Sequence, residues 1–302
     1  MGTTEVNAAR QAMGPVGVFL PGPILDGPVS TNEQRESVRK LEAAGYRMAW
    51  NNEIVWDKDV FVHLALLLAA TERMAFGSSI ANIWARTPQV AGLAAANVAE
   101  AFPDRFVLGI GVGYEGQALS VGKEWGHPLD NMRAYLDAMQ VPQGMRQVPD
   151  AAYPMVMAAR RPKMLALSGE IADGVNCNMV PPEWTAHARN VLGPDKLVII
   201  GVSTILDDDL DRARETGRAS ARSVAPILAE LEGISFSDEE LAAGSDAVVD
   251  SLIAYGSPER IADQVRAHLD AGADHVMIML NGQNYTTGIE QSLALAPTLT
   301  AI

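Results

Sequence analysis

The sequence predicts an α/β fold, a (β/α)₈ TIM barrel with a helical insertion between strands seven and eight. Eight apolar, strand-like runs occur along the chain, and several lack polar alternation, as strands buried on both faces do. Helical patterns separate these runs, and no Gly/Ser-rich linker or shift of composition divides the 302 residues. Because α/β barrels commonly reach this length as one domain, residues 1–302 are expected to form a single barrel domain.

The barrel elements follow one another in a regular order. Strands are expected at 16–20, 47–51, 74–79, 106–112, 155–159, 174–177, 198–205 and 275–280. Helices between them are expected to begin near Thr31, Asp59, Thr87, Pro128, Pro162 and Pro181. At Thr87-Pro88 a capping residue precedes a proline in the first helical position. In this helix the apolar residues that recur with helical spacing, and are expected to face the sheet, are Val90, Leu93, Ala94 and Val98.

The stretch from about 207 to 272 departs from the simple repeat. Its patterns are helical over 208–231, 238–255 and 257–271. The acidic residues at 207–209 and the run Ser257-Pro258-Glu259 are typical of helix starts. This stretch is therefore expected to be a helical elaboration between the last two strands.

Composition and charge exclude several classes of function. A net charge of −14 disfavours binding to nucleic acid or to an anionic membrane surface. The single Cys177 excludes an internal disulfide. The N-terminal residues lack the apolar core of a signal peptide, and the longest apolar run, 64–70, is too short to span a bilayer. A cytoplasmic protein that binds neither nucleic acid nor membrane is expected, and no cluster with metal-ligand spacing or nucleophile elbow is present.

The segment 74–113 carries the strongest functional signal. It is predicted to form strand, loop, helix, turn and strand, and both strands end in small residues, at 77–79 and 109–113. Bare backbone at the C-terminal ends of parallel strands leaves room for a flat ligand. Residues 79–88 and 105–111 resemble the luciferase-like monooxygenase superfamily of flavin and deazaflavin enzymes, especially its F420-dependent oxidoreductases. The resemblance extends from Val16 to about Leu280, with Phe102-Pro103-Asp104-Arg105 in place of the more usual Ser-Pro-Gly-Arg turn.

The resemblance implies a coenzyme F420 site at the barrel's strand ends. Glu53 matches an acidic residue that lies beside the ring in this family; alternatively it is a solvent-exposed loop carboxylate that caps a neighbouring helix. Ser79-Ile80 matches a non-prolyl cis peptide beneath the middle ring, and the alternative is a plain strand end. The backbone of Gly111, Val112 and Gly113 would approach the ring, although such a run also forms simple tight turns.

A second group of residues matches the turn that binds the cofactor phosphate in this family. These are Ala158, Ala159 and Arg160, which precede a predicted helix whose N-terminal N–H groups favour an anion. A solvated helix start is the alternative.

Two polar residues are candidate catalytic groups. Tyr114 could donate a hydrogen bond or pack, and His127 could line the mouth of the site or cap a helix start. Tyr114 and Ile54 occupy positions where sugar-phosphate dehydrogenases of this superfamily have Glu and a catalytic His, so sugar-phosphate oxidation is disfavoured. In the loop after strand three, Trp84 could wall the substrate cavity or pack beneath the loop. His63 and His268 fall in helices and are interpreted as structural.

The expected function is hydride transfer between F420 and a small organic substrate, in a homodimer by analogy with the family. Two alternatives remain open at this point. One is an FMN-dependent monooxygenase on the same scaffold, and the other is a non-catalytic flavin-binding barrel.

Overall fold

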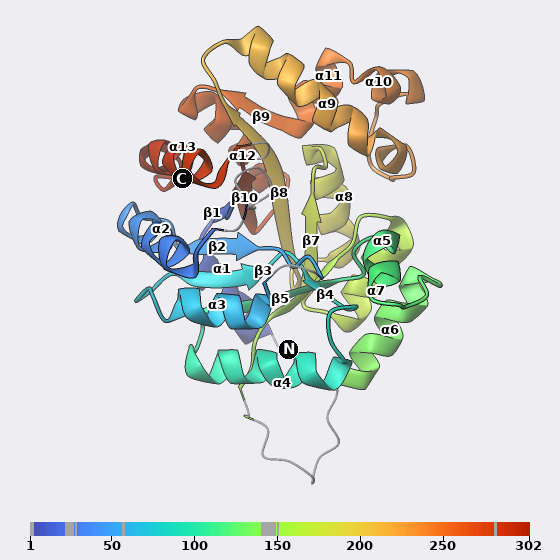
Figure 1. Cartoon of the computed structure of the whole chain (residues 1–302). Coiled ribbons are helices and arrows are strands. Elements are labelled where there is room, and N and C mark those ends of the chain that lie inside the picture. Colours follow the sequence, from blue (N-terminus) through green and yellow to red (C-terminus); the bar gives the residue numbers. More distant parts are fainter. Residues whose placement is uncertain are drawn as a thin grey trace.

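The computed structural model describes residues 3–21, 27, 29–55, 58–139, 149, 151–280 and 283–302. Its centre is a closed barrel of eight parallel strands (Figure 1). The barrel strands are β1 (Val16–Phe19), β2 (Met48–Asn51), β3 (Ala75–Ser78), β5 (Phe106–Gly111), β6 (Met155–Ala158), β7 (Gly174–Asn178), β8 (Leu197–Leu206) and β10 (His275–Met279). The barrel closes because β10 pairs with both β1 and β8. All eight predicted strands are confirmed, and a two-residue strand, β4 (Ala81–Asn82), also pairs with β5.

Helices cover the outside of the barrel. They are α2 (Thr31–Ala43), α3 (Val60–Leu68), α4 (Pro88–Ala101), α5 (Glu115–Ser120), α6 (Pro128–Met139), α7 (Pro162–Ile171), α8 (Pro182–Leu192), α12 (Pro258–Asp270) and α13 (Tyr285–Leu299). Side chains cap several starts: Ser30 accepts from the Glu33 N–H, and Asp59 accepts from the Phe61 and Val62 N–H groups. Within the described part of the chain, no helix combines the length and apolarity required to cross a bilayer.

The predicted inner face of α4 is partly wrong. Val90 is 52% exposed, and Leu93 and Ala94 are only half-buried, whereas Val98 is buried as expected. The buried stripe instead contains Ala91, Ala95 and Ala99. Alanines at four-residue spacing bring a helix close to its neighbours, so this face packs without large side chains.

An N-terminal helix, α1 (Thr3–Met13), closes one end of the barrel and was not predicted. Its buried residues Val6, Ala9 and Met13 belong to the same apolar cluster as side chains inside the barrel, such as Met48, Val107 and Leu197. Arg10 ties the helix to the start of two strands, with Nε donating to Asp274 Oδ1 at 2.8 Å and Nη2 to the Lys196 carbonyl at 3.0 Å. Because β8 and β10 begin beside these residues, α1 lies at the N-terminal ends of the strands.

A buried histidine sits at this closed end. His275 Nδ1 lies 2.7 Å from the Gly14 carbonyl, and Trp50 Nε1 donates to His275 Nε2 at 3.0 Å. These partners require a neutral ring that is protonated on Nδ1. Burial lowers the pKa of His275 to about 4, and burial does the same to His268, which contacts Thr185 Oγ1 at 2.8 Å.

These two histidines make acid destabilisation an expected property. The unfolded chain binds protons near the ordinary pKa of 6.5, whereas the folded chain does so only near pH 4. The contribution of the two neutral histidines to the free energy of unfolding is therefore complete above pH 6.5 and is lost as the pH falls toward 4. Between pH 7 and pH 5 each histidine should remove about 2 kcal/mol from the free energy of unfolding, measured in urea. His268→Gln should flatten this pH dependence, and an equal slope in variant and wild type would contradict the assignment.

The helical insertion is built around an overlong strand. The ten-residue β8 pairs with β7 up to Gly201, and from Ser203 it pairs with β9 (Ile253–Gly256). Ser203 also pairs with Met279 of β10, so β9 continues along the edge of β8 that β7 leaves free. Three helices complete the insertion: α9 (Leu210–Leu228), α10 (Asp238–Ala243) and α11 (Asp246–Leu252). Figure 1 shows β8 rising from the barrel toward these helices.

The prediction of continuous helix over 238–255 is wrong in two places. The chain leaves α10 at Gly244, whose φ of 57° is left-handed and typical of a helix C-terminus. Ile253, Ala254 and Tyr255 are buried strand residues rather than the end of a helix. The free edge of β8 supplies hydrogen-bond partners for this apolar run, which local helical periodicity does not reveal.

Candidate functional site

The C-terminal ends of β3, β5 and β6 form a floor of small residues. A Cβ atom at Gly109 would lie 1.9 Å from the Ser78 carbonyl oxygen. A Cβ atom at Gly111 would lie 2.9 Å from both the Ile80 Cγ1 and the Ala158 Cβ atoms. The Ser79–Ile80 peptide bond is cis, as predicted. Glycine at 109 and 111 therefore lets the chain leaving β3 lie directly on β5. This packing brings together the predicted site residues Ser79, Ile80, Gly111 and Ala158.

Glu53 lies at the same end of the barrel, but its carboxylate is fully engaged by the protein. It is 4% exposed, and it accepts from the Val60 N–H at 3.1 Å and the Asn82 N–H at 2.9 Å. The Arg86 guanidinium also binds both of its oxygens. Glu53 thus holds the start of α3 and the loop after β3 together, which confirms the helix-capping part of the alternative, whereas the expected solvent exposure is wrong. Its contact with a cofactor stays a prediction.

Arg86 also binds a second carboxylate. Its Nη2 donates to Asp59 Oδ2 at 2.8 Å. Burial alone would lower the pKa of Arg86, but the carboxylates of Glu53 and Asp59 outweigh this effect and raise it. Burial opposes ionisation of Asp59, yet the Val62 N–H and Arg86 hold its pKa below the ordinary value. The group is therefore a charged structural cluster beside the site.

The loop after β5 presents its backbone and then turns outward. The Val112 carbonyl accepts from Trp84 Nε1 at 2.7 Å, and Gly113 has a φ of 61°. A Cβ atom at Gly113 would lie 2.5 Å from Asn82 Nδ2, so glycine is required here. Trp84 packs against Trp125, with ring centroids 6.1 Å apart, and is half-buried. Trp84 thus links the loop after β3 to the loop after β5, and its predicted role in the wall of the substrate cavity stays a prediction.

The two candidate catalytic side chains are both exposed. Tyr114 is 76% exposed, and its N–H donates to Gln117 Oε1 at 3.0 Å at the start of α5. His127 is exposed just before α6, and its carbonyl accepts from the Asn131 N–H at 2.9 Å. The structure therefore places both residues on the surface, in the connection between β5 and α6. Their catalytic roles stay predictions.

The predicted phosphate-binding turn lies between β6 and α7. Ala158 is half-buried and Ala159 is buried, while α7 begins at Pro162 with no side-chain cap. Arg160 is half-buried and lies beside the Cys177 thiol, whereas Arg161 is paired with Glu230 of the insertion at 2.5 Å. Burial raises the pKa of Cys177 to about 11 despite Arg160, so this thiol stays protonated. Among the described contacts, Arg161 is thus paired with a carboxylate, whereas Arg160 is not.

Two residues at the end of β7 were missed by the sequence analysis. Asn176 and Asn178 alternate with Val175 and Cys177, which pack in the outer core. Within the described residues, Asn176 Nδ2 and Asn178 Oδ1 are buried without a hydrogen-bond partner. Unpaired buried polar atoms above a floor of glycine and alanine fit a planar ligand with a polar edge, such as a flavin or deazaflavin ring. Their signal in the sequence is an Asn-x-Asn repeat inside an otherwise apolar buried strand.

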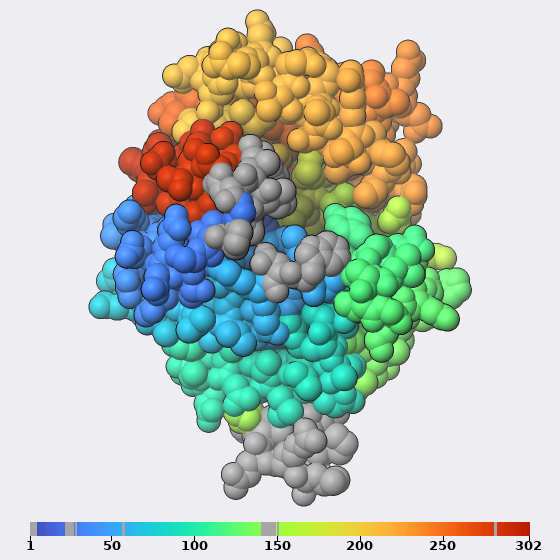
Figure 2. Space-filling view, viewed as in Figure 1, coloured from blue at the N-terminus to red at the C-terminus, as the bar shows by residue number. Residues whose placement is uncertain are grey.

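The surface above this floor recedes. Figure 2 shows a hollow between the orange insertion and the green helices around α5, with olive atoms of the β7–α8 segment at its base. In the described ranges no three His, Cys, Asp or Glu side chains are grouped as a metal site.

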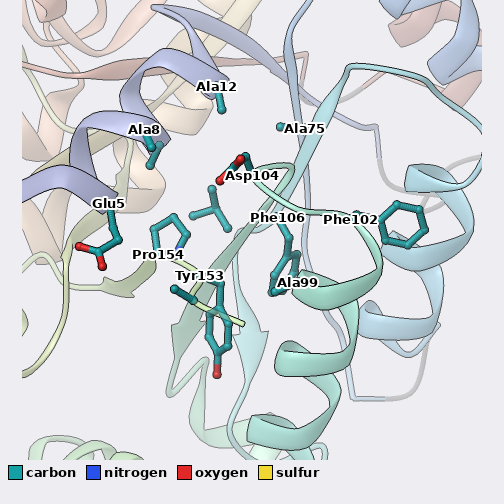
Figure 3. Close-up of a pocket in the computed structure, with 13 residues that line it drawn as sticks. Glu5, Ala8, Ala12, Ala75, Ala99, Phe102, Asp104, Phe106, Tyr153 and Pro154 are labelled. Atoms are coloured by element: carbon teal, nitrogen blue, oxygen red, sulfur yellow. The ribbon is translucent and has the colours of Figure 1, made fainter. Parts of the chain in front are cut away.

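A separate, smaller pocket lies at the other end of the barrel. Glu5, Ala8 and Ala12 of α1 face Asp104, Phe106 and Tyr153 across it (Figure 3). Its volume is about 70 Å³. Ligands of α/β barrels bind at the opposite, C-terminal end of the strands.

Comparison with known proteins identifies the family of this chain. A family model described as luciferase-like monooxygenase matches residues 15–275, from the start of β1 to the first residue of β10. The chain belongs to the luciferase-like monooxygenase family. The resemblance based on residues 79–88 and 105–111 is thereby confirmed.

Individual relatives are distant in sequence and similar in fold. The chain is 25% identical over 228 residues to a 5,10-methylenetetrahydromethanopterin reductase of Archaeoglobus fulgidus, covering 66% of this chain and 69% of the relative. It is 24% identical over 284 residues to an F420-dependent glucose-6-phosphate dehydrogenase of Nocardia farcinica, covering 79% and 83%. The structure of an F420-dependent secondary alcohol dehydrogenase with an F420-acetone adduct superposes with a TM-score of 0.71 at 15% identity, covering 94% and 98%.

An FMN enzyme has nearly the same fold. The oxygenating constituent of 3,6-diketocamphane monooxygenase from Pseudomonas putida, in complex with FMN, superposes with a TM-score of 0.68 at 14% identity, covering 94% of this chain and 98% of that one. At these identities the superpositions show the fold alone.

Proposed function

We propose that this protein is an F420-dependent oxidoreductase that transfers a hydride between the deazaflavin and a small organic substrate. The observation that carries the proposal is the barrel mouth itself, where unpaired amide atoms face a floor of small residues. The relatives direct the proposal to F420, because the Nocardia farcinica relative is an F420-dependent dehydrogenase. A homodimeric assembly is part of the proposal as a prediction from the family.

The chain's own residues would bind and orient the ring. F420, when bound, supplies hydride transfer at its deazaflavin ring. The backbone at Ser79-Ile80 and at Gly111 would flank that ring, and the turn from Ala158 to Arg160 would bind its anionic tail. Arg160 and the uncapped start of α7 provide positive charge and N–H groups for this purpose. Tyr114 and His127 are the candidates for moving a proton at the open side.

An FMN-dependent monooxygenase is the second candidate. It is favoured by the similar fold of the Pseudomonas putida enzyme that binds FMN. Both rings are flat and share a pyrimidine edge, so the floor of the site suits either. The two candidates differ in the length and charge of the tail that the turn before α7 must bind.

Equilibrium binding separates these functions. Titration of the protein into F420, followed by the fluorescence of F420, is expected to give a Kd at least about tenfold below the Kd for FMN. A tenfold preference corresponds to about 1.4 kcal/mol of binding free energy. Tighter binding of FMN would replace the first candidate by the second. Absence of binding to both chromophores, in a protein that unfolds cooperatively, would contradict the enzyme assignment.

A further inference from the structure

Two asparagines on the inner face of β7 are polar where the rest of the strand is apolar. Asn176 is 3% exposed, and the residues on either side of it, Val175 and Cys177, point into the outer core. Because successive strand residues face opposite sides, Asn176 and Asn178 both face the barrel interior at its open end. Packing between β7 and the outer helices therefore does not explain why an amide side chain stands at either position.

Each amide keeps one polar atom without a partner among the described residues. Asn176 Oδ1 accepts a long bond from Ser79 Oγ at 3.4 Å, while Asn176 Nδ2 is unpaired. The Oδ1 atom of Asn178 is also unpaired. A buried polar group without a partner destabilises the protein, so a ligand that supplies the partner would gain affinity by binding here.

The surroundings define the chemistry of that ligand. Asn176 Nδ2 would lie 3.5 Å from a Cβ atom at Gly109, which places it above the floor of the site. Asn178 Oδ1 and Met279 Sδ converge on Gly201, at 2.2 Å and 2.7 Å from where its Cβ atom would be. The neighbours are thus a hydroxyl, a thioether and glycine backbone, all uncharged. Such a site suits a neutral edge that offers one acceptor and one donor.

We infer that Asn176 and Asn178 form an amide subsite for the imide edge of the cofactor ring. A ring carbonyl would accept from Asn176 Nδ2, and the adjacent ring N–H would donate to Asn178 Oδ1. The inference rests on the proposed function, since it assigns residues to the ring of that cofactor. Flavin and deazaflavin carry the same imide edge, so this subsite orients either ring and leaves the choice of cofactor to the tail-binding turn.

Tail-free rings test the subsite directly. Lumiflavin carries the imide N–H, and 3-methyllumiflavin replaces it by a methyl group. The wild type is expected to bind lumiflavin at least about tenfold more tightly than the methylated ring, measured by fluorescence titration. Asn178→Leu should abolish this discrimination. Asn176→Leu should weaken binding of both rings, and of F420, by about tenfold.

A control and a second readout keep the test decisive. Asn97 is exposed on α4 and bonds only the Leu93 carbonyl, so Asn97→Leu should bind each ring as the wild type does. Because leucine removes an unpaired buried polar atom, Asn176→Leu should match or exceed the wild-type Tm while binding more weakly. Unchanged ring and F420 affinities in both β7 variants, or equal wild-type affinity for the two lumiflavins, would overturn the subsite. A wild type that binds neither F420 nor FMN would overturn the proposed function instead.

Discussion

Arg86→Ala is expected to lower the free energy of unfolding by about 3–5 kcal/mol. The Arg86 side chain is only 9% exposed, and that of its partner Glu53 is 2% exposed. Removing the guanidinium leaves a buried carboxylate that keeps two backbone N–H donors but loses its cation. The loss should be measured by urea unfolding at pH 7.

An exposed pair provides the matched comparison. Arg133 and Glu170 are paired at 2.8 Å with side chains 46% and 59% exposed. Solvent screens such a pair, so Arg133→Ala should lower the free energy of unfolding far less than Arg86→Ala does. Similar losses in the two variants would show that the Arg86 cluster does not hold α3 and the loop after β3 in the way its geometry indicates.

Gly109→Ala is expected to destabilise the protein by about 3 kcal/mol and to abolish ring binding. Its added methyl group would stand 1.9 Å from the Ser78 carbonyl oxygen. That atom belongs to the backbone of the neighbouring strand, so relief requires β3 to move and carries Ser79 and Ile80 with it. Thermal unfolding and F420 titration measure the two effects on one sample.

Gly116→Ala is the control for this substitution. Gly116 lies in α5, and no atom stands within 4 Å of its Cβ position. Alanine there should leave ring binding unchanged and raise stability by up to about 1 kcal/mol. Wild-type stability in Gly109→Ala would mean that β3 and β5 are not packed as closely as the structure shows.

The barrel was predictable because its strands are buried on both faces. Runs such as 106–112 and 198–205 are apolar without alternation, and the helices between them begin at capping residues or prolines, so type and order followed from local sequence. The cis bond at Ser79–Ile80 was predicted through the family resemblance and is confirmed. Neither composition nor periodicity alone contains that information.

The errors concern contacts that are distant in sequence. The helix α1 is stabilised by the interior of a barrel whose strands come later in the chain, so its own residues gave little sign of it. The strand β9 depends on the free edge of β8, about fifty residues earlier in the sequence. The fully engaged carboxylate of Glu53 depends on Arg86, and the unpaired amides of β7 depend on which face of that strand is inside. These contacts can be predicted only when the register of the strands in the assembled sheet is known.

Helix α1 covers the N-terminal ends of the strands, because Val6, Ala9 and Met13 pack against side chains that fill the inside of the barrel. A ligand of the proposed kind would therefore approach from the C-terminal ends of the strands, so substitutions on the outer face of α1 should change stability without changing ligand affinity.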